Sequence, residues 1–224
     1  MSVTPVDQVS VPLALFDYVP VVLGAVGAFL VARRLGAALA YIGAAMIFAG
    51  GFAKATEKLL SATGIADIPR LADALFPVMG CGFLLLAASA WGVRNIALAA
   101  PVVGAAAIGV AVPDIAGRYL VGVIVGATAL YAALARDAWR DRDVTTVAFL
   151  VVCLVGTYTL GPLAGQEQTV ALQWVEQSIN TFSQGAFAVA AWRLSVGSRN
   201  RVSVGTFAEA QRTRVPRRGP RRSS

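Results

Sequence analysis

The sequence predicts an all-α integral membrane protein, built as a bundle of seven transmembrane helices. Of its 224 residues, 57% are hydrophobic and 14% are charged, whereas a soluble domain carries about 25% charged residues. The apolar residues come in blocks of about twenty, the length that an α-helix needs to cross a hydrocarbon layer of ~30 Å. Most links between the blocks are short, which is typical of antiparallel neighbours in one bundle.

The first three spans are separated by charged or polar links. The first span, at about 13–32, follows a segment without lysine or arginine. It therefore lacks the charged region of a secretory signal, and we expect it to be retained. Pro20 should distort this helix, because proline cannot donate a backbone hydrogen bond. A tight turn with two arginines leads to the second span at about 35–55, and the third lies at about 71–92.

The fourth span is the shortest, at about 96–112, and it contains Pro101, which should kink or tilt it. Without it the count would be six, and both termini would lie on one side of the membrane. The last three spans lie at about 117–135, 144–162 and 169–192.

Spans 1–3 and 5–7 would then run in the same directions, with the fourth as a linker. Weak matches between the two halves, such as Trp91 with Trp192, are compatible with a 3+1+3 parallel repeat of the kind found in transporters. Such matches also arise easily in a chain rich in alanine and valine.

The lysines and arginines predict the orientation, because these residues collect beside the spans on the cytoplasmic side. With the N-terminus outside and the C-terminus in the cytoplasm, most of the 19 cations fall inside. The four that fall outside are Lys54, Lys58, Arg70 and Arg118. Most acidic residues also fall outside, so an outward-facing vestibule would favour cations. We expect a multi-pass protein of the cell membrane, with the lipid bilayer as its surroundings.

Residues 193–224 form a second segment after the bundle of residues 1–192. This segment is rich in arginine, serine, glycine and proline and poor in large apolar side chains, a composition typical of disorder. We expect it to be a cytoplasmic tail that contacts anionic lipid of the inner leaflet, with about 1 kcal/mol for each basic residue near the surface. No nucleic-acid partner is expected, because no aromatic residue is interleaved with the final arginines.

The residue types present exclude several kinds of chemistry. Histidine is absent, and Cys81 and Cys153 lie in apolar spans, where they suit a role as small packing residues. The usual ligand sets for zinc, haem or copper are therefore missing, and so are nucleophilic dyads or triads that need histidine. We expect neither a metal site nor a cofactor.

Two families share parts of the predicted plan. Microbial rhodopsins also have seven spans and an outside N-terminus, but no lysine follows Lys58 to bind retinal in the last helix. A retinal protein is therefore excluded. The plan is also similar to that of sugar transporters built from two parallel three-helix units, although no motif supports this likeness and a shared fold does not carry function.

A stripe of polar residues runs along the first half of the last span, in the sequence ALQWVEQSINTFSQG. Its spacing places the amides on one helical face, with a glutamate beside them. Such groups cost kilocalories each when they face hydrocarbon. The stripe predicts a wall that faces a water-filled cavity from the outer surface to mid-membrane, with interhelical hydrogen bonding as the alternative. Its residues are Gln173, Glu176, Gln177, Asn180 and Gln184.

Charged residues of the first two spans lie at the same outer end. Lys54 and Glu57 share one face of the second helix, where the alternative role is a snorkelling lysine paired with the glutamate. Asp17 lies inside the outer end of the first helix, and we expect an ion pair with Lys54 or Lys58 because the two helices are neighbours. With the stripe, these residues predict an outward-open polar cup with a closed floor.

The cup favours a protein that binds or transports a small polar or cationic solute, with Glu176 and Asn180 at the site. One alternative is a lipid-modifying membrane enzyme that uses Asp17, Glu57 and Glu176 as acid and base, although no nucleophile or metal motif accompanies them. Another alternative is a non-catalytic sensor or assembly subunit with the arginine-rich tail as its output. Binding or transport is favoured over catalysis.

Overall fold

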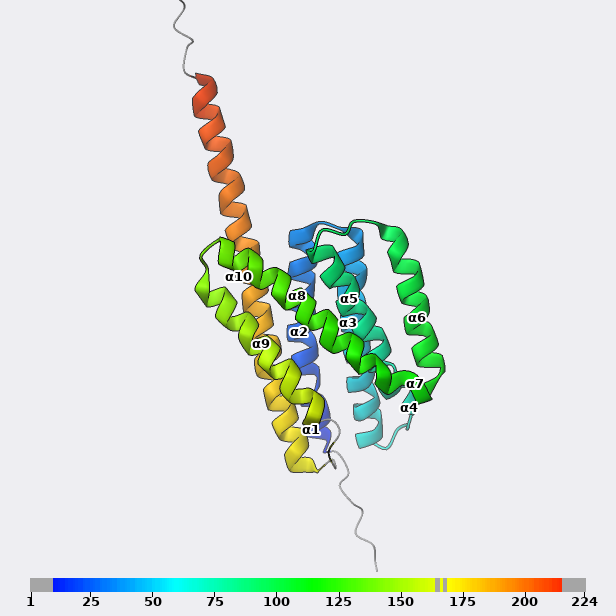
Figure 1. Ribbon diagram of the computed structural model, residues 1–224. Coiled ribbons are helices and arrows are strands. Elements are labelled where there is room, and N and C mark those ends of the chain that lie inside the picture. The colour runs from blue at the N-terminus through cyan, green and yellow to red at the C-terminus, as the bar shows by residue number, and fades with distance from the viewer. Residues whose placement is uncertain (1–9, 164–165, 167–168, 215–224) are drawn as a thin grey trace, which may run out of the picture.

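The structure is a computed structural model that describes residues 10–163, 166 and 169–214. This part of the chain is all helical, without a strand (Figure 1). Five helical segments are long and apolar enough to cross a membrane, which identifies a multi-pass membrane protein. They are Val11–Leu35, Ala38–Ala62, Pro69–Ala90, Asp114–Arg140 and Val144–Leu163.

The first segment is interrupted at Asp17, between α1 (Val11–Phe16) and α2 (Tyr18–Leu35). Pro20 causes the interruption, because it has no N–H to donate to the carbonyl of the residue four positions earlier. The distortion predicted at Pro20 is thus confirmed. The helix ends later than the sequence predicted, with both arginines in its last turn and Gly36 in a left-handed conformation (φ 63°) as the cap.

The second and third segments form an antiparallel pair. The second is α3 (Ala38–Ala62), and the third is divided into α4 (Pro69–Asp73) and α5 (Leu75–Ala90). The division at Ala74 has the same cause as the one at Asp17, because Pro77 cannot bond the carbonyl of Asp73.

The region predicted as the fourth span is shorter than the others. It consists of the 3-10 helix η1 (Ile96–Leu98) and α6 (Ala99–Ala111), an apolar segment below the length needed to count among the five. Pro101 is in the first turn of α6, where the backbone N–H groups lack helical partners in any case. It therefore needs no kink, contrary to our expectation.

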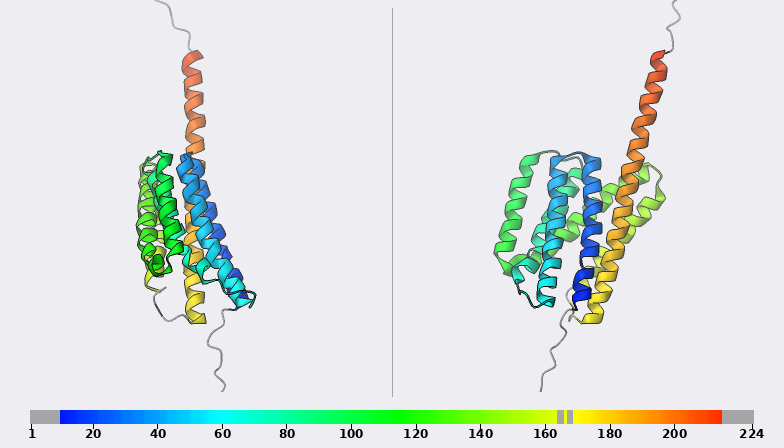
Figure 2. Two further views of the ribbon diagram at one scale, coloured as in Figure 1. Left: turned by 90° about the vertical axis from the view of Figure 1, so that its right-hand side faces the viewer. Right: turned by 180° about the vertical axis from the view of Figure 1, so that it is seen from behind.

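The remaining helices are longer. After α7 (Pro113–Ala116) and the 3-10 helix η2 (Gly117–Tyr119) come α8 (Leu120–Arg140) and α9 (Val144–Leu163). The last helix, α10 (Val170–Arg214), is absent from the five apolar segments because its polar stripe lowers its mean hydropathy. It projects beyond the bundle into the region predicted as a tail (Figures 1 and 2). The division into bundle and disordered tail remains a prediction, and residues 215–224 lie outside the described part.

Six helices form a closed ring in which each contacts the next in the order α2, α3, α5, α8, α9, α10 and back to α2. In this ring α2 and α3 lie on the opposite side of the molecule from α8 (Figure 2). By contrast, α6 packs against α5 on the outside of the ring. We call the end where α1 and α10 begin the α1 end. The opposite end, with turns at 36–37, 91–95 and 141–143, is the arginine end.

Glycines bring the α3 and α5 backbones into direct contact. A Cβ added at Gly82 would lie 2.8 Å from the carbonyl oxygen of Gly43 and 2.9 Å from the nitrogen of Ile47. The reverse contact at Gly43 is equally close, with the Gly82 oxygen at 2.7 Å. Glycines on this face of α3 therefore let the neighbouring helix approach closely.

We expect Gly82→Ala to lower the unfolding free energy by about 1–3 kcal/mol, because the added methyl meets backbone atoms that can move only with their helices. Thermal unfolding of the protein in detergent measures this. Gly104→Ala in α6 is the matched control, since an added Cβ there meets nothing within 4 Å. Equal melting temperatures for Gly82→Ala and the unmodified protein would contradict the close α3–α5 contact.

Candidate functional site

A cavity of about 200 Å³ lies inside the ring. Residues from α2, α3, α5, α8, α9 and α10 line it, together with Asp17 at the junction of α1 and α2. Its charged and amide residues come from the junction of α1 and α2, the last third of α3 and the first turns of α10. The cavity therefore lies towards the α1 end of the bundle.

The polar stripe of α10 supplies one wall of this cavity. Glu176, Gln177, Asn180 and Gln184 line it, and the Gln184 side-chain nitrogen lies 3.5 Å from the Asn180 oxygen. Gln173 belongs to the same stripe by sequence but is buried and does not line the cavity. The stripe thus contributes four of its five residues.

Asp17, at the junction of α1 and α2, also lines the cavity. Its carboxylate is 4% exposed and pairs with Lys58, whose Nζ lies 2.8 Å from Oδ2. The ion pair expected between the first two spans is confirmed, with Lys58 as the partner. The second carboxylate oxygen, Oδ1, is buried and has no hydrogen-bond partner among the described residues.

Lys54 is the cation that borders the cavity. Its side chain is exposed, and it takes part in none of the ion pairs formed within the described residues. Asp17, Glu176 and Glu57 are the carboxylates within electrostatic range. Glu57 itself is half-buried and does not line the cavity, so it does not join Asp17 and Glu176 in the arrangement that the alternative of carboxylate catalysis requires.

The opposite part of the cavity wall is apolar. Phe76, Met79 and Phe83 of α5 lie there, and α8 adds a row of aliphatic side chains. That row is Leu120, Val123, Ile124 and Ala127. The cavity is therefore amphipathic, with charged and amide groups from the α1–α2 junction, α3 and α10 and an apolar surface from α5 and α8.

The cavity has a closed floor towards the arginine end. Tyr131 lines it and packs edge-on against Phe187 of α10, with ring centroids 5.5 Å apart. Phe187 is 1% exposed and fills the space beside Gly27 of α2, where an added Cβ would lie 2.5 Å from the ring. Beyond this pair the ring interior is filled by the main hydrophobic core, which includes Leu130 and Leu134.

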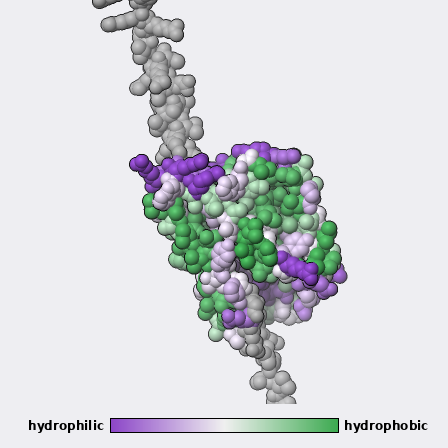
Figure 3. Space-filling view, in the orientation of Figure 1, coloured by the Kyte–Doolittle hydropathy of each residue, from purple (hydrophilic) through white to green (hydrophobic). Residues whose placement is uncertain are grey.

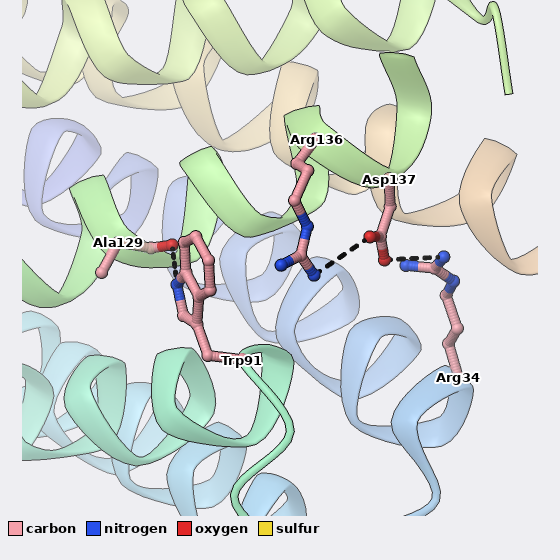
Figure 4. Close-up of polar contacts among 5 residues, drawn as sticks. All are labelled: Arg34, Trp91, Ala129, Arg136 and Asp137. Carbon is pink, nitrogen blue, oxygen red and sulfur yellow. Dashed lines mark hydrogen bonds and ion pairs between the residues drawn. The ribbon is translucent and has the colours of Figure 1, made fainter. Parts of the chain in front are cut away.

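Ion pairs connect the helices beyond that floor. Arg34 of α2 and Arg136 of α8 both bond Asp137, at 3.1 and 3.3 Å (Figure 4). The Arg136 guanidinium also lies over the ring of Trp91, 4.6 Å from its centroid, a favourable cation–π geometry. Trp91 in turn donates its indole N–H to the Ala129 carbonyl of α8. This cluster joins α2, α5 and α8.

A second network joins α9 to α10. Asp143 caps the start of α9 by accepting hydrogen bonds from the N–H and the hydroxyl of Thr146. Arg193 of α10 donates to Asp143 at 2.8 Å and to the Thr146 hydroxyl at 3.0 Å. The hydrogen bond from Arg193, helped by those from Thr146, lowers the pKa of Asp143 from 3.8 to about 2.

The surface has the distribution expected for a membrane-embedded bundle. Hydrophilic residues gather at the end from which α10 projects, next to a broad hydrophobic face (Figure 3). Phe182 on α10 is 71% exposed and lies outside the cavity lining. The opposite faces of α10 are thus apolar outside the ring and polar inside it.

Six of the eight residues predicted for the site line one cavity, and only Gln173 and Glu57 do not. Sequence reasoning missed the apolar wall and Tyr131. The sequence gives no signal that separates an apolar residue facing a cavity from one facing lipid or core, because both are hydrophobic.

No family model, curated protein or solved structure matches the chain, so its function has to be inferred from the chemistry of the site.

We expect Lys58→Met to destabilise the protein by roughly 3–5 kcal/mol, because it leaves the buried Asp17 carboxylate without its cation. The double variant Asp17→Asn with Lys58→Met should recover much of this loss. Thermal unfolding in detergent compares the two. The same melting temperature for the single and the double variant would show that the ion pair does not hold the two helices in this way.

The pKa of Asp143 is lowered in the folded state, so its contribution to stability is present above about pH 4 and is lost as the pH falls towards 2. Asp143→Asn should therefore be less stable than the unmodified protein at neutral pH, with a smaller loss of stability on acidification. Melting temperatures measured across pH 6 to about pH 2 test this. Asp114→Asn, at an exposed position of the α1 end, is the control. Parallel pH profiles for all three proteins would contradict the role of Asp143.

Proposed function

We propose that the protein is a seven-span protein of the cell membrane that binds a small polar or cationic solute in its cavity and moves it across the bilayer. The N-terminus is outside, so the α1 end and the cavity face outwards. In this arrangement α6 and the first part of α10 are the two spans beyond the five long apolar segments.

One observation carries this proposal: polar and charged residues from three separate helical segments line one cavity inside an apolar bundle. Asp17, Lys54 and the stripe of α10 are far apart in the sequence. Buried charges and amides are costly in a membrane and usually mark a solute or ion pathway. A ladder of interhelical hydrogen bonds would instead have brought the side chains into contact with each other and left no cavity.

The arginines support the orientation. Arg33, Arg34, Arg94 and Arg193 lie at the arginine end together with the turn at 141–143. Cations next to spans favour the cytoplasmic side, which puts the α1 end outside. On the same basis the arginine-rich segment after Arg193 is proposed to contact anionic lipid of the inner leaflet.

Transport requires the floor of the cavity to open. In the state described here, the Tyr131–Phe187 contact and the ion pairs of Arg34 and Arg193 close the arginine end. Solute would enter from outside, and release to the cytoplasm would follow separation of these contacts. This order of events is the alternating access of secondary transporters.

Cysteine accessibility tests the proposal without knowledge of the solute. In a background with Cys81→Ala and Cys153→Ala, both free and buried in the native chain, Gln177→Cys should react with a membrane-impermeant thiol reagent added to intact cells. Phe182→Cys is the matched control on the same helix. It should not react, because hydrocarbon suppresses the thiolate that such reagents need. A panel of small amines, amino acids and polyols should contain members that slow the reaction at Gln177→Cys.

Orientation is tested in the same cells, because Arg142→Cys at the arginine end should react only after the membrane is permeabilised. No reaction at Gln177→Cys, or a reaction that no solute of the panel slows, would overturn the proposed function. Reaction of Arg142→Cys in intact cells would reverse the orientation.

A further inference from the structure

We infer that the solute of the cavity is a zwitterion: a small molecule with an ammonium group, a carboxylate group and an apolar substituent, such as an apolar amino acid. This inference rests on the proposed function and narrows its solute class. It follows from three properties of the cavity wall, namely its charge pattern, its unpaired acceptors and its apolar side.

The charges of the wall are separated and nearly balanced. Asp17 pairs with Lys58 at 2.8 Å, and Lys54 and Glu176 are charges of opposite sign that also border the cavity. A simple cation would meet the ammonium of Lys54, and a simple anion would meet the carboxylates of Glu176 and Asp17. Such like-charge contacts are costly where the dielectric constant is low. A zwitterion carries one positive and one negative group, so each group can lie next to a wall charge of the opposite sign and both like-charge contacts are avoided.

Two buried acceptors indicate where its ammonium group would lie. Asp17 Oδ1 and Gln177 Oε1 are both buried and have no hydrogen-bond partner among the described residues, and both residues line the cavity. A buried acceptor left without a donor is destabilising, and an ammonium group supplies three donors. The carboxylate group would pair with Lys54, whose ammonium is in none of the described ion pairs.

The apolar wall and the volume limit the substituent. Phe76, Met79 and Phe83 face the space together with the α8 row of Leu120, Val123, Ile124 and Ala127. Burial of each methylene group of the solute against such a surface favours binding. The cavity of about 200 Å³ is smaller than the roughly 300–1,000 Å³ of sites for drug-sized ligands. A branched side chain of a few carbon atoms is therefore the expected size.

Three probes that differ by one group test the inference on the unmodified protein. Leucine carries both charges, isoamylamine lacks the carboxylate, and 4-methylpentanoate lacks the ammonium. We expect leucine to bind at least about tenfold more tightly than either analogue, since each analogue loses one charge-assisted hydrogen-bonding group. The measurement is calorimetry on the purified, unmodified protein in lipid nanodiscs.

Variants then assign the carboxylate contact. Lys54→Met should reduce the affinity for leucine to that for isoamylamine and leave isoamylamine binding as strong or stronger, whereas Lys54→Arg should keep the preference for leucine. Ser178→Ala is the matched control on α10, because Ser178 is exposed and its hydroxyl bonds the backbone of its own helix. Binding by this control should not change.

Two results would overturn the inference and leave the proposed function standing. Isoamylamine that binds as tightly as leucine would identify a cation site. Calorimetric binding of other members of the solute panel to the unmodified protein, but not of leucine, would identify a different solute class. Failure of Gln177→Cys to react, or of every solute to protect it, would count against the proposed function itself.

Discussion

A polar face on a membrane helix must be covered by protein or water, and this constraint organises the whole bundle. Without other helices around it, the stripe of α10 would expose a glutamate and several amides to hydrocarbon, at a cost of kilocalories each. The ring covers the stripe, because α10 packs between α2 and α9 and its polar side chains point into the cavity. The polar helix is therefore also the element that closes the ring. Phe182 and Val189 on its other faces remain exposed, as a lipid-facing surface requires.

Closing the ring depends on small residues where α10 meets its neighbours. Gly24 and Gly27 of α2 lie against Gln184 and Phe187, with 2.8 and 2.5 Å between an added Cβ and the nearest atoms. On the other side, an added Cβ at Gly156 of α9 would clash with the Ser183 hydroxyl. Such contacts let helix backbones approach closely in a membrane, where van der Waals packing replaces the hydrophobic effect as the driving force. The same contacts fix the depth at which the stripe ends and the floor begins, because Gln184 and Phe187 are neighbours on one face of α10.

The sequence was informative wherever a polar residue interrupted an apolar helix. The spacing of Gln177, Asn180 and Gln184 predicted a common face, and that face lines the cavity. Prolines likewise marked the interruption at Asp17. Gln173 shares the helical face of the stripe but does not line the cavity. The periodicity of a sequence predicts which residues share a face, but it does not predict where along that face the neighbouring helices end and the cavity begins. The apolar wall had no sequence signal, since Phe76 or Ile124 has the same hydrophobicity whether it faces a cavity, the core or lipid. The five apolar segments do not include α10 for a related reason, because a helix with a covered polar face need not be apolar on average.

The charged residues at the two ends of the ring have different surroundings. They border a cavity at the α1 end, and they form ion pairs between helices at the arginine end. At the α1 end, Lys54 borders an accessible cavity, and Asp17 has one carboxylate oxygen without a partner. At the arginine end, Asp137 is shared by Arg34 and Arg136, and Asp143 is held by Arg193. These pairs connect α2 with α8 and α9 with α10, so the ring cannot widen there without separating charges. Ion pairs with partial solvent contact cost little to break, whereas the packed contact of Tyr131 with Phe187 excludes water. The aromatic pair is therefore the main barrier beneath the cavity, and under the proposed transport function the ion pairs would set which helices move together.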